Sequence, residues 1–196
     1  MIQAGRRWLL AVALLLGAVG PPLPAAAVTA APLPVIGPAP AFELTDQTGR
    51  ALALADLRGK ALAVSFIFTT CSDSCPILTA KMADVKRRLG TDFGPRVNFV
   101  SITVDPLNDT PARLRGYASA HGADVPGWHF LTGKPDEIAD VVRRYGAFAR
   151  PSDRGGIEHL FLTTLIDRRG NLRVQYLGWR FDSDEMSRDF RSLLNE

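Results

Sequence analysis

The pattern of hydrophobic positions alternates between strand-like and helix-like segments along most of the chain. Residues 61–70 (ALAVSFIFTT) form an unbroken apolar run rich in β-branched and aromatic side chains, which is typical of a central strand covered on both faces. Residues 96–105 (RVNFVSITVD) form a second strand-like segment. Between them, residues 76–90 predict a helix that begins near Pro76, ends at Gly90 and buries one apolar stripe: Ile77, Leu78, Met82, Val85 and Leu89.

The remaining segments continue this alternation. Helices are predicted within 108–122 and 134–147, a short strand at 128–133, a hairpin from 159–167 into 171–178, and a closing helix from about 182 to 194. Residues 41–54 predict an earlier hairpin around Gly49. Strands that alternate with helices pair in parallel through crossovers. The order predicts an α/β protein with a thioredoxin-like fold: a central mixed sheet flanked by helices, with an N-terminal β-hairpin.

The first 27 residues have the pattern of an export signal. Arg6 and Arg7 precede an apolar run from Trp8 to Val19, and small residues such as Ala25 and Ala27 follow at signal-peptidase spacing. An uncleaved membrane anchor is the competing interpretation. The apolar run has twelve residues, whereas a bilayer-spanning helix needs about 20. Cleavage is therefore favoured, and we expect a protein in the periplasm or on the outer face of the inner membrane.

The charge balance gives no indication of a nucleic-acid partner. The full chain has 23 basic and 20 acidic residues and a net charge of +3. Loss of residues 1–27 removes two arginines and no acid, which leaves a charge of +1. We interpret the basic triplet 86–88 as a solvated helix face. Residues 28–41 are rich in proline and alanine, so we expect an extended linker ahead of one domain at 42–196.

The only two cysteines, Cys71 and Cys75, lie where the first central strand gives way to a helix. Backbone N–H groups and the helix dipole favour thiolates at such a position. At this spacing in a helix the two Cα atoms lie about 6 Å apart, so the pair can close a disulfide or hold a metal ion. A purely structural disulfide would add little stability because its loop is short.

Two features argue against a general disulfide exchanger. Thr70 stands where an aromatic residue usually precedes the first cysteine, and no proline precedes the late strand where thioredoxin-like exchangers carry a cis-proline. The chain offers His159 in that region instead. The arrangement of proline, threonine and cysteine that is usual in thiol peroxidases is also absent.

Four blocks together resemble the Sco/SenC family of copper-binding assembly factors for cytochrome c oxidase. They are FIFTTCSDSCP, SITVDPLNDTPARLRGY, FLTG and GGIEHLFLTTLIDRRGNL, and the resemblance extends from Phe42 to Tyr176. It implies a metallochaperone, not an enzyme, that binds one copper ion through Cys71, Cys75 and His159. The copper would be delivered to the copper-centre subunit of cytochrome c oxidase during assembly. The alternative is a thiol-disulfide reductase that maintains the cysteines of that centre.

The donor set agrees with copper. Thiolates favour Cu(I), and imidazole suits copper in either oxidation state, so Cu(I) and Cu(II) are both expected. Zinc normally requires a fourth ligand and ranks lower. Another copper chaperone or a thiol reductase would be a further partner, and the N-terminus would allow association with the membrane.

Four other residues with ligand-like side chains receive simpler interpretations. Asp73 is expected to cap the helix that follows it. Asp105 either tunes the site or serves as a turn residue before a proline. His121 is expected at a helix end, and His129 in a short strand, without a metal-binding role.

Overall fold

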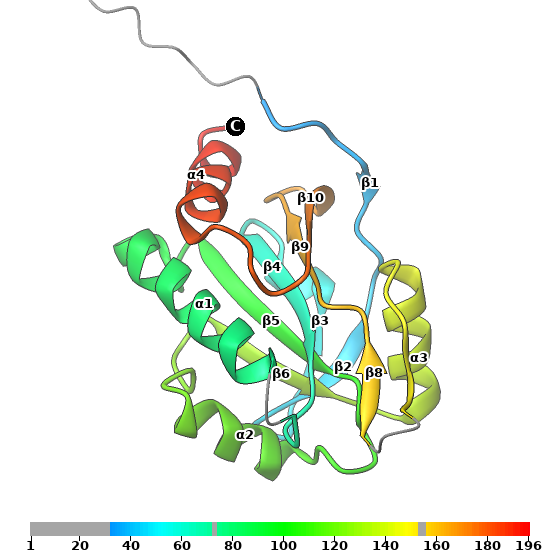
Figure 1. Cartoon of the computed structure of the whole chain (residues 1–196). Helices are drawn as coiled ribbons and strands as arrows, with labels where there is room; N and C mark the ends of the chain where they lie inside the picture. The colour runs from blue at the N-terminus through cyan, green and yellow to red at the C-terminus, as the bar shows by residue number, and fades with distance from the viewer. Residues whose placement is uncertain (1–31, 72–73, 153–155) are drawn as a thin grey trace, which may run out of the picture. The chain divides into compact units, whose positions relative to one another are not determined.

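The computed structural model describes residues 32–71, 74–152 and 156–196. The strands are β1 (Gly37–Pro38), β2 (Glu43–Asp46), β3 (Ala51–Ala53), β4 (Ala61–Ile67), β5 (Val97–Thr103), β6 (Trp128–Thr132), β7 (Ala149–Pro151), β8 (Ile157–His159), β9 (Leu162–Ile166) and β10 (Asn171–Leu177). The helices are α1 (Ser74–Leu89), α2 (Pro111–Ala120), α3 (Pro135–Arg144) and α4 (Ser183–Leu194), with short 3-10 turns at Leu54–Leu57 and Gly90–Asp92. The four helices and the strands β2 to β6, β9 and β10 lie in the order expected from the sequence, whereas β1, β7 and β8 were not predicted (Figure 1).

The main sheet is mixed, as predicted. Its strand order is β1-β10-β9-β4-β5-β6-β2-β3. Strands β4, β5 and β6 are parallel neighbours, because α1 and α2 cross over between them. Strand β9 runs antiparallel to β4, and β10 and β2 run antiparallel to their neighbours. The parallel pairs and both predicted hairpins are confirmed.

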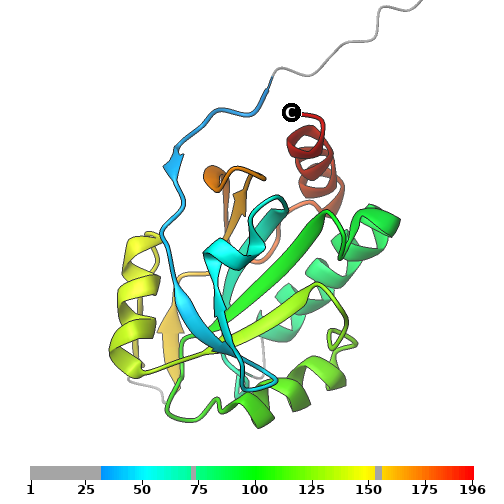
Figure 2. The ribbon, with the colours of Figure 1, turned by 180° about the vertical axis from the view of Figure 1, so that it is seen from behind.

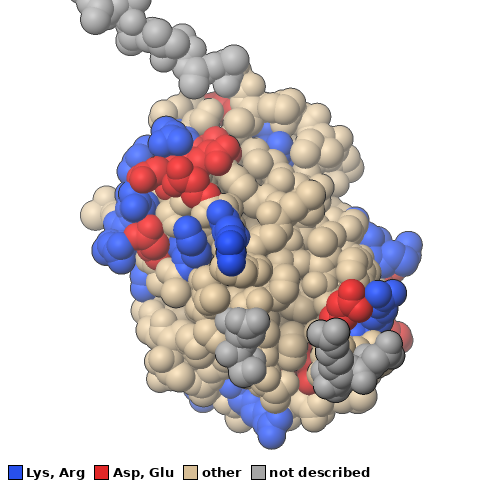
Figure 3. Space-filling model, viewed as in Figure 1, with Lys and Arg blue, Asp and Glu red and all other residues tan. Residues whose placement is uncertain are grey.

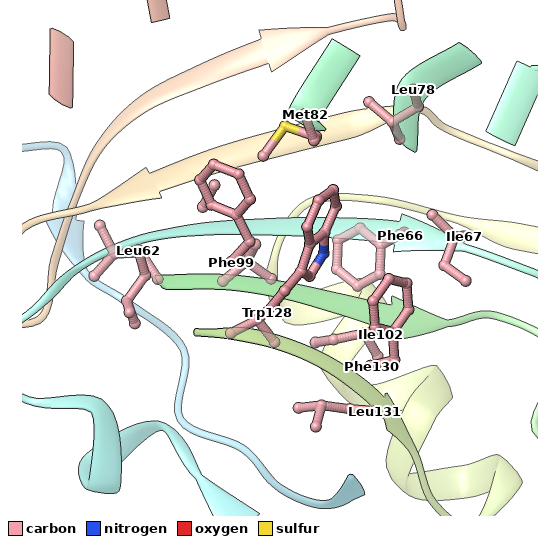
Figure 4. Close-up of a cluster of buried hydrophobic side chains, with 14 of the residues drawn as sticks. Leu62, Phe66, Ile67, Leu78, Met82, Phe99, Ile102, Trp128, Phe130 and Leu131 are labelled. Atoms are coloured by element: carbon pink, nitrogen blue, oxygen red, sulfur yellow. The ribbon is translucent and has the colours of Figure 1, made fainter. Parts of the chain in front are cut away.

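Helices cover both faces of this sheet. Helices α1 and α4 lie side by side on one face, and α3 lies on the opposite face (Figures 1 and 2). Every residue of β4 and β5 is buried, which explains why these strands have continuous apolar sequences. The side chains in Figure 4 form the centre of this core: Leu62, Phe66, Ile67, Leu78, Met82, Phe99, Ile102, Trp128, Phe130 and Leu131.

One predicted core residue is misplaced. Ile77 has helical spacing with the buried stripe of α1, but its side chain is 38% exposed. The helix begins at Ser74, and the buried stripe follows Cys75, Leu78, Met82 and Val85. Ile77 therefore lies beside the stripe, on the surface near the start of the helix.

The sequence pattern predicts a single strand over 159–167, and this prediction is wrong. His159 ends β8, which pairs with β7 in a separate two-stranded sheet, and β9 begins only at Leu162. The N–H of Leu160 bonds the carbonyl of Phe148, so the chain stays with β7 until it turns into the main sheet. Each strand of the β7–β8 pair has only three residues, so no alternating apolar pattern indicates it.

The described part of the proline- and alanine-rich segment is extended, and it is attached to the sheet. β1 pairs with β10, and the N–H groups of Ile36 and Ala39 bond the carbonyls of Leu172 and Gly170. The prediction of a signal or anchor at 1–27 lies outside the described residues. Within 32–71, 74–152 and 156–196, no helix is long and apolar enough to cross a membrane.

Candidate metal centre

The first cysteine lies at the end of a tight turn that follows β4. The N–H of Cys71 bonds the carbonyl of Phe68 at 3.3 Å, which closes the turn 68–71. Cys75 lies in the first turn of α1, and its N–H points to the Cys71 sulfur at 3.4 Å. Cys71 is half-buried, whereas the Cys75 side chain is fully buried. An N–H donated to sulfur at a helix start stabilises negative charge there, as a thiolate or a metal-bound sulfur requires.

The fold brings His159 to the second cysteine. His159 Nε2 lies 3.9 Å from Cys75 Sγ, although 84 residues separate them. The imidazole is 7% exposed and packs against two rings, with centroid distances of 5.6 Å to Phe68 and 4.3 Å to Phe161. Its other nitrogen, Nδ1, is buried and has no hydrogen-bond partner among the described residues. A buried imidazole without a partner on one nitrogen has unused capacity to bind a ligand.

Burial sets the protonation of both groups. It raises the pKa of the Cys75 thiol far above its ordinary value, and the nearby Cys71 and Asp109 act in the same direction. Burial also lowers the pKa of His159, so the imidazole is neutral at pH 7. Neutral imidazole is the form that ligates metals. The metal-free site therefore presents a thiol and a neutral imidazole in contact.

Both cysteines are free thiols. Among the described residues, no group of three or more histidine, cysteine, aspartate or glutamate side chains stands close enough together to hold a metal ion. The structure thus places Cys75 and His159 in contact and Cys71 beside them through the Cys75 N–H. For Cys71, Cys75 and His159 to hold one metal ion together, their side chains would have to move closer to one another.

The other candidate residues have simpler roles. The Asp105 carboxylate accepts hydrogen bonds from the Asn108 side-chain amide at 3.0 Å, as a turn residue does. His121 caps the end of α2 and stacks on Tyr117, and His129 is half-buried in β6. The predicted cap at Asp73 lies outside the described residues.

Sequence reasoning missed one polar residue next to the site. Asp109 lies between β5 and α2 and is fully buried. Its carboxylate accepts hydrogen bonds from the Thr69 N–H at 3.0 Å, the Thr69 hydroxyl and the Thr103 hydroxyl at 2.6 Å. Its position just before a Thr-Pro helix start favours an ordinary turn interpretation, and only the tertiary structure shows its contact with the turn that leads to Cys71.

The surface on this side of the molecule has few charges at its centre. Figure 3 shows acidic and basic side chains gathered over α1 and α4 and at the opposite edge near α3 and β8, with further basic side chains at the lower edge; the described residues between these groups carry few charges. Many of the charges on α1 are paired, for example Asp84 with Arg87 and Arg88. The described residues on this face form no continuous basic surface of the kind that binds nucleic acid.

Comparison with known proteins identifies the family. The model of the SCO1/SenC family matches residues 36–195. The chain belongs to the SCO1/SenC family.

Two sequence relatives illustrate how far this SCO1/SenC protein resembles others. It is 36% identical over 140 residues to the SCO1 protein homolog of Bacillus subtilis, covering 70% of this chain and 72% of the relative. It is 38% identical over 115 residues to the mitochondrial SCO2 homolog of Bos taurus, covering 57% of this chain and 42% of the relative. The SCO1/SenC chain thus spans less than half of the bovine protein.

Solved structures confirm the thioredoxin-like Sco fold. Bradyrhizobium japonicum ScoI, solved with copper bound, has a TM-score of 0.68 and 33% identity, covering 78% of this chain and 97% of that one. BsSco has a TM-score of 0.73 and 26% identity, covering 83% and 98%. BsSco is described as having a disulfide switch and as a member of the Sco family of cytochrome c oxidase assembly proteins.

Proposed function

We propose that this SCO1/SenC protein is a metallochaperone that binds one copper ion through Cys71, Cys75 and His159 and delivers it to the copper-centre subunit of cytochrome c oxidase. The main support is the 3.9 Å contact between Cys75 Sγ and His159 Nε2, which brings a soft sulfur and a neutral nitrogen together from distant parts of the chain. The copper-bound ScoI structure and the place of BsSco among the cytochrome c oxidase assembly proteins support copper as the cargo.

The chemistry of these donors suits transfer. Two thiolates and one imidazole make a low-coordinate site that favours Cu(I), and imidazole also suits Cu(II). Three protein ligands leave a position open for a ligand from the recipient. The Cys75 thiol is protonated in the metal-free protein, so copper binding releases its proton.

The second candidate function is thiol-disulfide reduction of the oxidase cysteines. It is favoured by the unequal exposure of the two thiols, because Cys71 is half-buried and Cys75 fully buried. Cys71 would attack the substrate disulfide, and Cys75 would then resolve the mixed disulfide. A disulfide between the two would remove two copper ligands, so the same pair would also gate copper binding.

We place this activity outside the cytoplasm, on the periplasmic side of the inner membrane, with residues 1–27 acting as a cleaved signal or a retained anchor. Copper would come from another copper chaperone, and a thiol reductase would keep Cys71 and Cys75 reduced. No nucleic-acid partner is expected.

Copper titration of the reduced protein tests the ligand set. The wild type should bind one equivalent of Cu(I) in competition with a chromophoric chelator, and His159→Ala and Cys75→Ser should each lose affinity by more than about 100-fold, because a direct ligand matters more than its supporting groups. His121→Ala is the matched control and should bind as the wild type does. Unchanged affinity in His159→Ala would contradict the proposed site.

A parallel assay separates the two functions. Reductase chemistry needs only the two sulfurs, so turnover on a model disulfide should persist in His159→Ala if the protein is a reductase. Copper affinity lost in that variant, with no measurable disulfide turnover in the wild type, supports the chaperone.

A further inference from the structure

A buried aspartate outside the proposed ligand set anchors the turn that carries the first cysteine. Asp109 is fully buried. The three side-chain hydrogen bonds that it makes among the described residues come from the carboxyl ends of two neighbouring strands: two from Thr69, just after β4, and one from Thr103, the last residue of β5. A buried carboxylate is costly unless its oxygens are bonded, and this one is satisfied by the turn and the strand end beside the site.

The residue that Asp109 holds lies between two groups of the candidate site. Thr69 is the second residue of the turn closed by the Cys71 N–H and the Phe68 carbonyl. Phe68, before it, packs edge-on against the His159 ring. Cys71, after it, accepts the Cys75 N–H at its sulfur. Displacement of Thr69 would therefore shift both the aromatic support of His159 and the position of the Cys71 sulfur.

A second hydrogen bond ties the network to the main sheet. The Thr103 hydroxyl donates to Asp109 and accepts the N–H of Asp105 at 2.9 Å. Thr103 pairs with Ile67, the last residue of β4, in the parallel ladder. The turn is thus fastened to a rigid strand end, which is the kind of support that keeps metal ligands in a productive arrangement.

We propose that Asp109 is a positioning residue of the copper site: its hydrogen bonds to Thr69 hold the 68–71 turn so that Cys71 can join Cys75 and His159 around one copper ion. The proposal rests on the proposed function. Asp109 touches none of the three ligands through a hydrogen bond in the described structure, and it acts through Thr69.

The test compares Asp109→Ala and Asp109→Asn with Asp105→Ala. Asp105 lies on the same loop and has the same side chain, but among the described residues its carboxylate accepts hydrogen bonds only from Asn108. Cu(I) affinity is measured by chelator competition well below the unfolding temperature, together with the sulfur-to-copper charge-transfer spectrum of the Cu(II) form. Loss of a supporting group typically costs about 10–100-fold in metal affinity.

We expect Asp109→Ala to lose affinity in this range and to shift the charge-transfer bands. Asp109→Asn should recover part of both, because its amide oxygen can still accept the Thr69 N–H, and Asp105→Ala should match the wild type. The spectrum separates a positioning role from a loss of stability, because destabilisation of the fold alone does not alter the metal geometry of the folded fraction. A change in affinity below fivefold in Asp109→Ala, with an unaltered spectrum, would overturn the proposal.

Two further measurements keep the test decisive. If Asp109→Ala does not fold, Thr69→Val removes one hydroxyl donor to the Asp109 carboxylate while preserving the shape of the side chain. A loss of Cu(I) affinity below fivefold in Thr69→Val would also overturn the proposal.

If the wild type binds no copper, the proposed function fails. The alkylation rate of Cys71 in the reduced, metal-free proteins then tests the turn by itself. A rate in Asp109→Ala within twofold of the wild type would refute the role of Asp109 in holding the turn, and a larger change would support that role without copper.

Discussion

Arg173 holds the first described residues of the chain against the sheet. Its side chain is 4% exposed. The guanidinium donates to the carbonyls of Leu33 and Pro34, the latter at 3.1 Å, and it pairs with the Asp167 carboxylate at 3.0 Å and with Glu196 at 2.8 Å. One side chain thereby joins the N-terminal segment, the turn between β9 and β10 and the C-terminus.

Replacement of Arg173 by alanine should strongly destabilise the domain. Asp167, which is 6% exposed, would lose its buried cation, and the two carbonyls would lose their donor. Removal of one partner of a buried ion pair costs about 3–5 kcal/mol. We expect a value near the lower limit, about 3 kcal/mol, because the Asp167 carboxylate keeps its hydrogen bonds from Asn171 and Arg169. For a domain of this size the melting temperature should fall by about 6–12 °C.

Urea and thermal unfolding followed by circular dichroism measure this loss. Arg169→Ala is the matched control: Arg169 is exposed in the same turn, and its replacement should change the free energy of unfolding by no more than about 0.5 kcal/mol. A loss below about 1 kcal/mol in Arg173→Ala would refute the reasoning, because it would mean that the desolvation of the guanidinium cancels its hydrogen bonds.

Three further predictions concern acid stability, thiol reactivity and backbone strain. Burial opposes ionisation of Asp167, but hydrogen bonds hold the pKa of its carboxyl below the ordinary 3.8. Asp167 therefore contributes stability above pH 3.8, and this contribution is lost as the pH falls through the lower pKa of the folded state. Asp167→Asn should lose this part of the acid dependence of unfolding, and an unchanged pH profile would contradict the assignment. In the reduced, metal-free protein, iodoacetamide at pH 7 should alkylate Cys71 at least about tenfold faster than Cys75, because Cys75 is buried and the pKa of its thiol is raised. Peptide mass spectrometry measures the two alkylation rates. Equal rates would contradict this prediction and show that the first turn of α1 opens readily. Gly127→Ala should destabilise the domain by about 1–3 kcal/mol, because φ is +90° and the new Cβ would lie 2.7 Å from a backbone Cα of the neighbouring loop. Gly116→Ala, in the interior of α2 with open space around it, should instead stabilise the domain by up to about 1 kcal/mol. Chemical unfolding should therefore show changes of opposite sign in the free energy of unfolding for the two variants.

The sequence by itself determined the order of the helices and of most strands of the main sheet, and the location of the cysteine turn. The apolar runs of β4 and β5 are continuous because both faces of these strands are buried, and that burial is readable without coordinates. Cys71 and Cys75 are the only cysteines and lie at a strand-to-helix junction. The four blocks that resemble the Sco/SenC family identified a family that the match over residues 36–195 confirms.

Only the tertiary structure decided which distant side chains meet. His159 lies far from both cysteines in the sequence, and only the family resemblance and its place near the absent cis-proline singled it out. Its contact with Cys75 depends on the β7–β8 pair, whose three-residue strands are too short to show a periodic pattern. Asp109 looks like an ordinary turn residue until the ends of β4 and β5 are brought together and enclose its carboxylate. Hydrophobic periodicity reports which face of a segment is buried, but contacts across 40 or 84 residues arise from how the segments pack, and a local pattern carries no record of that.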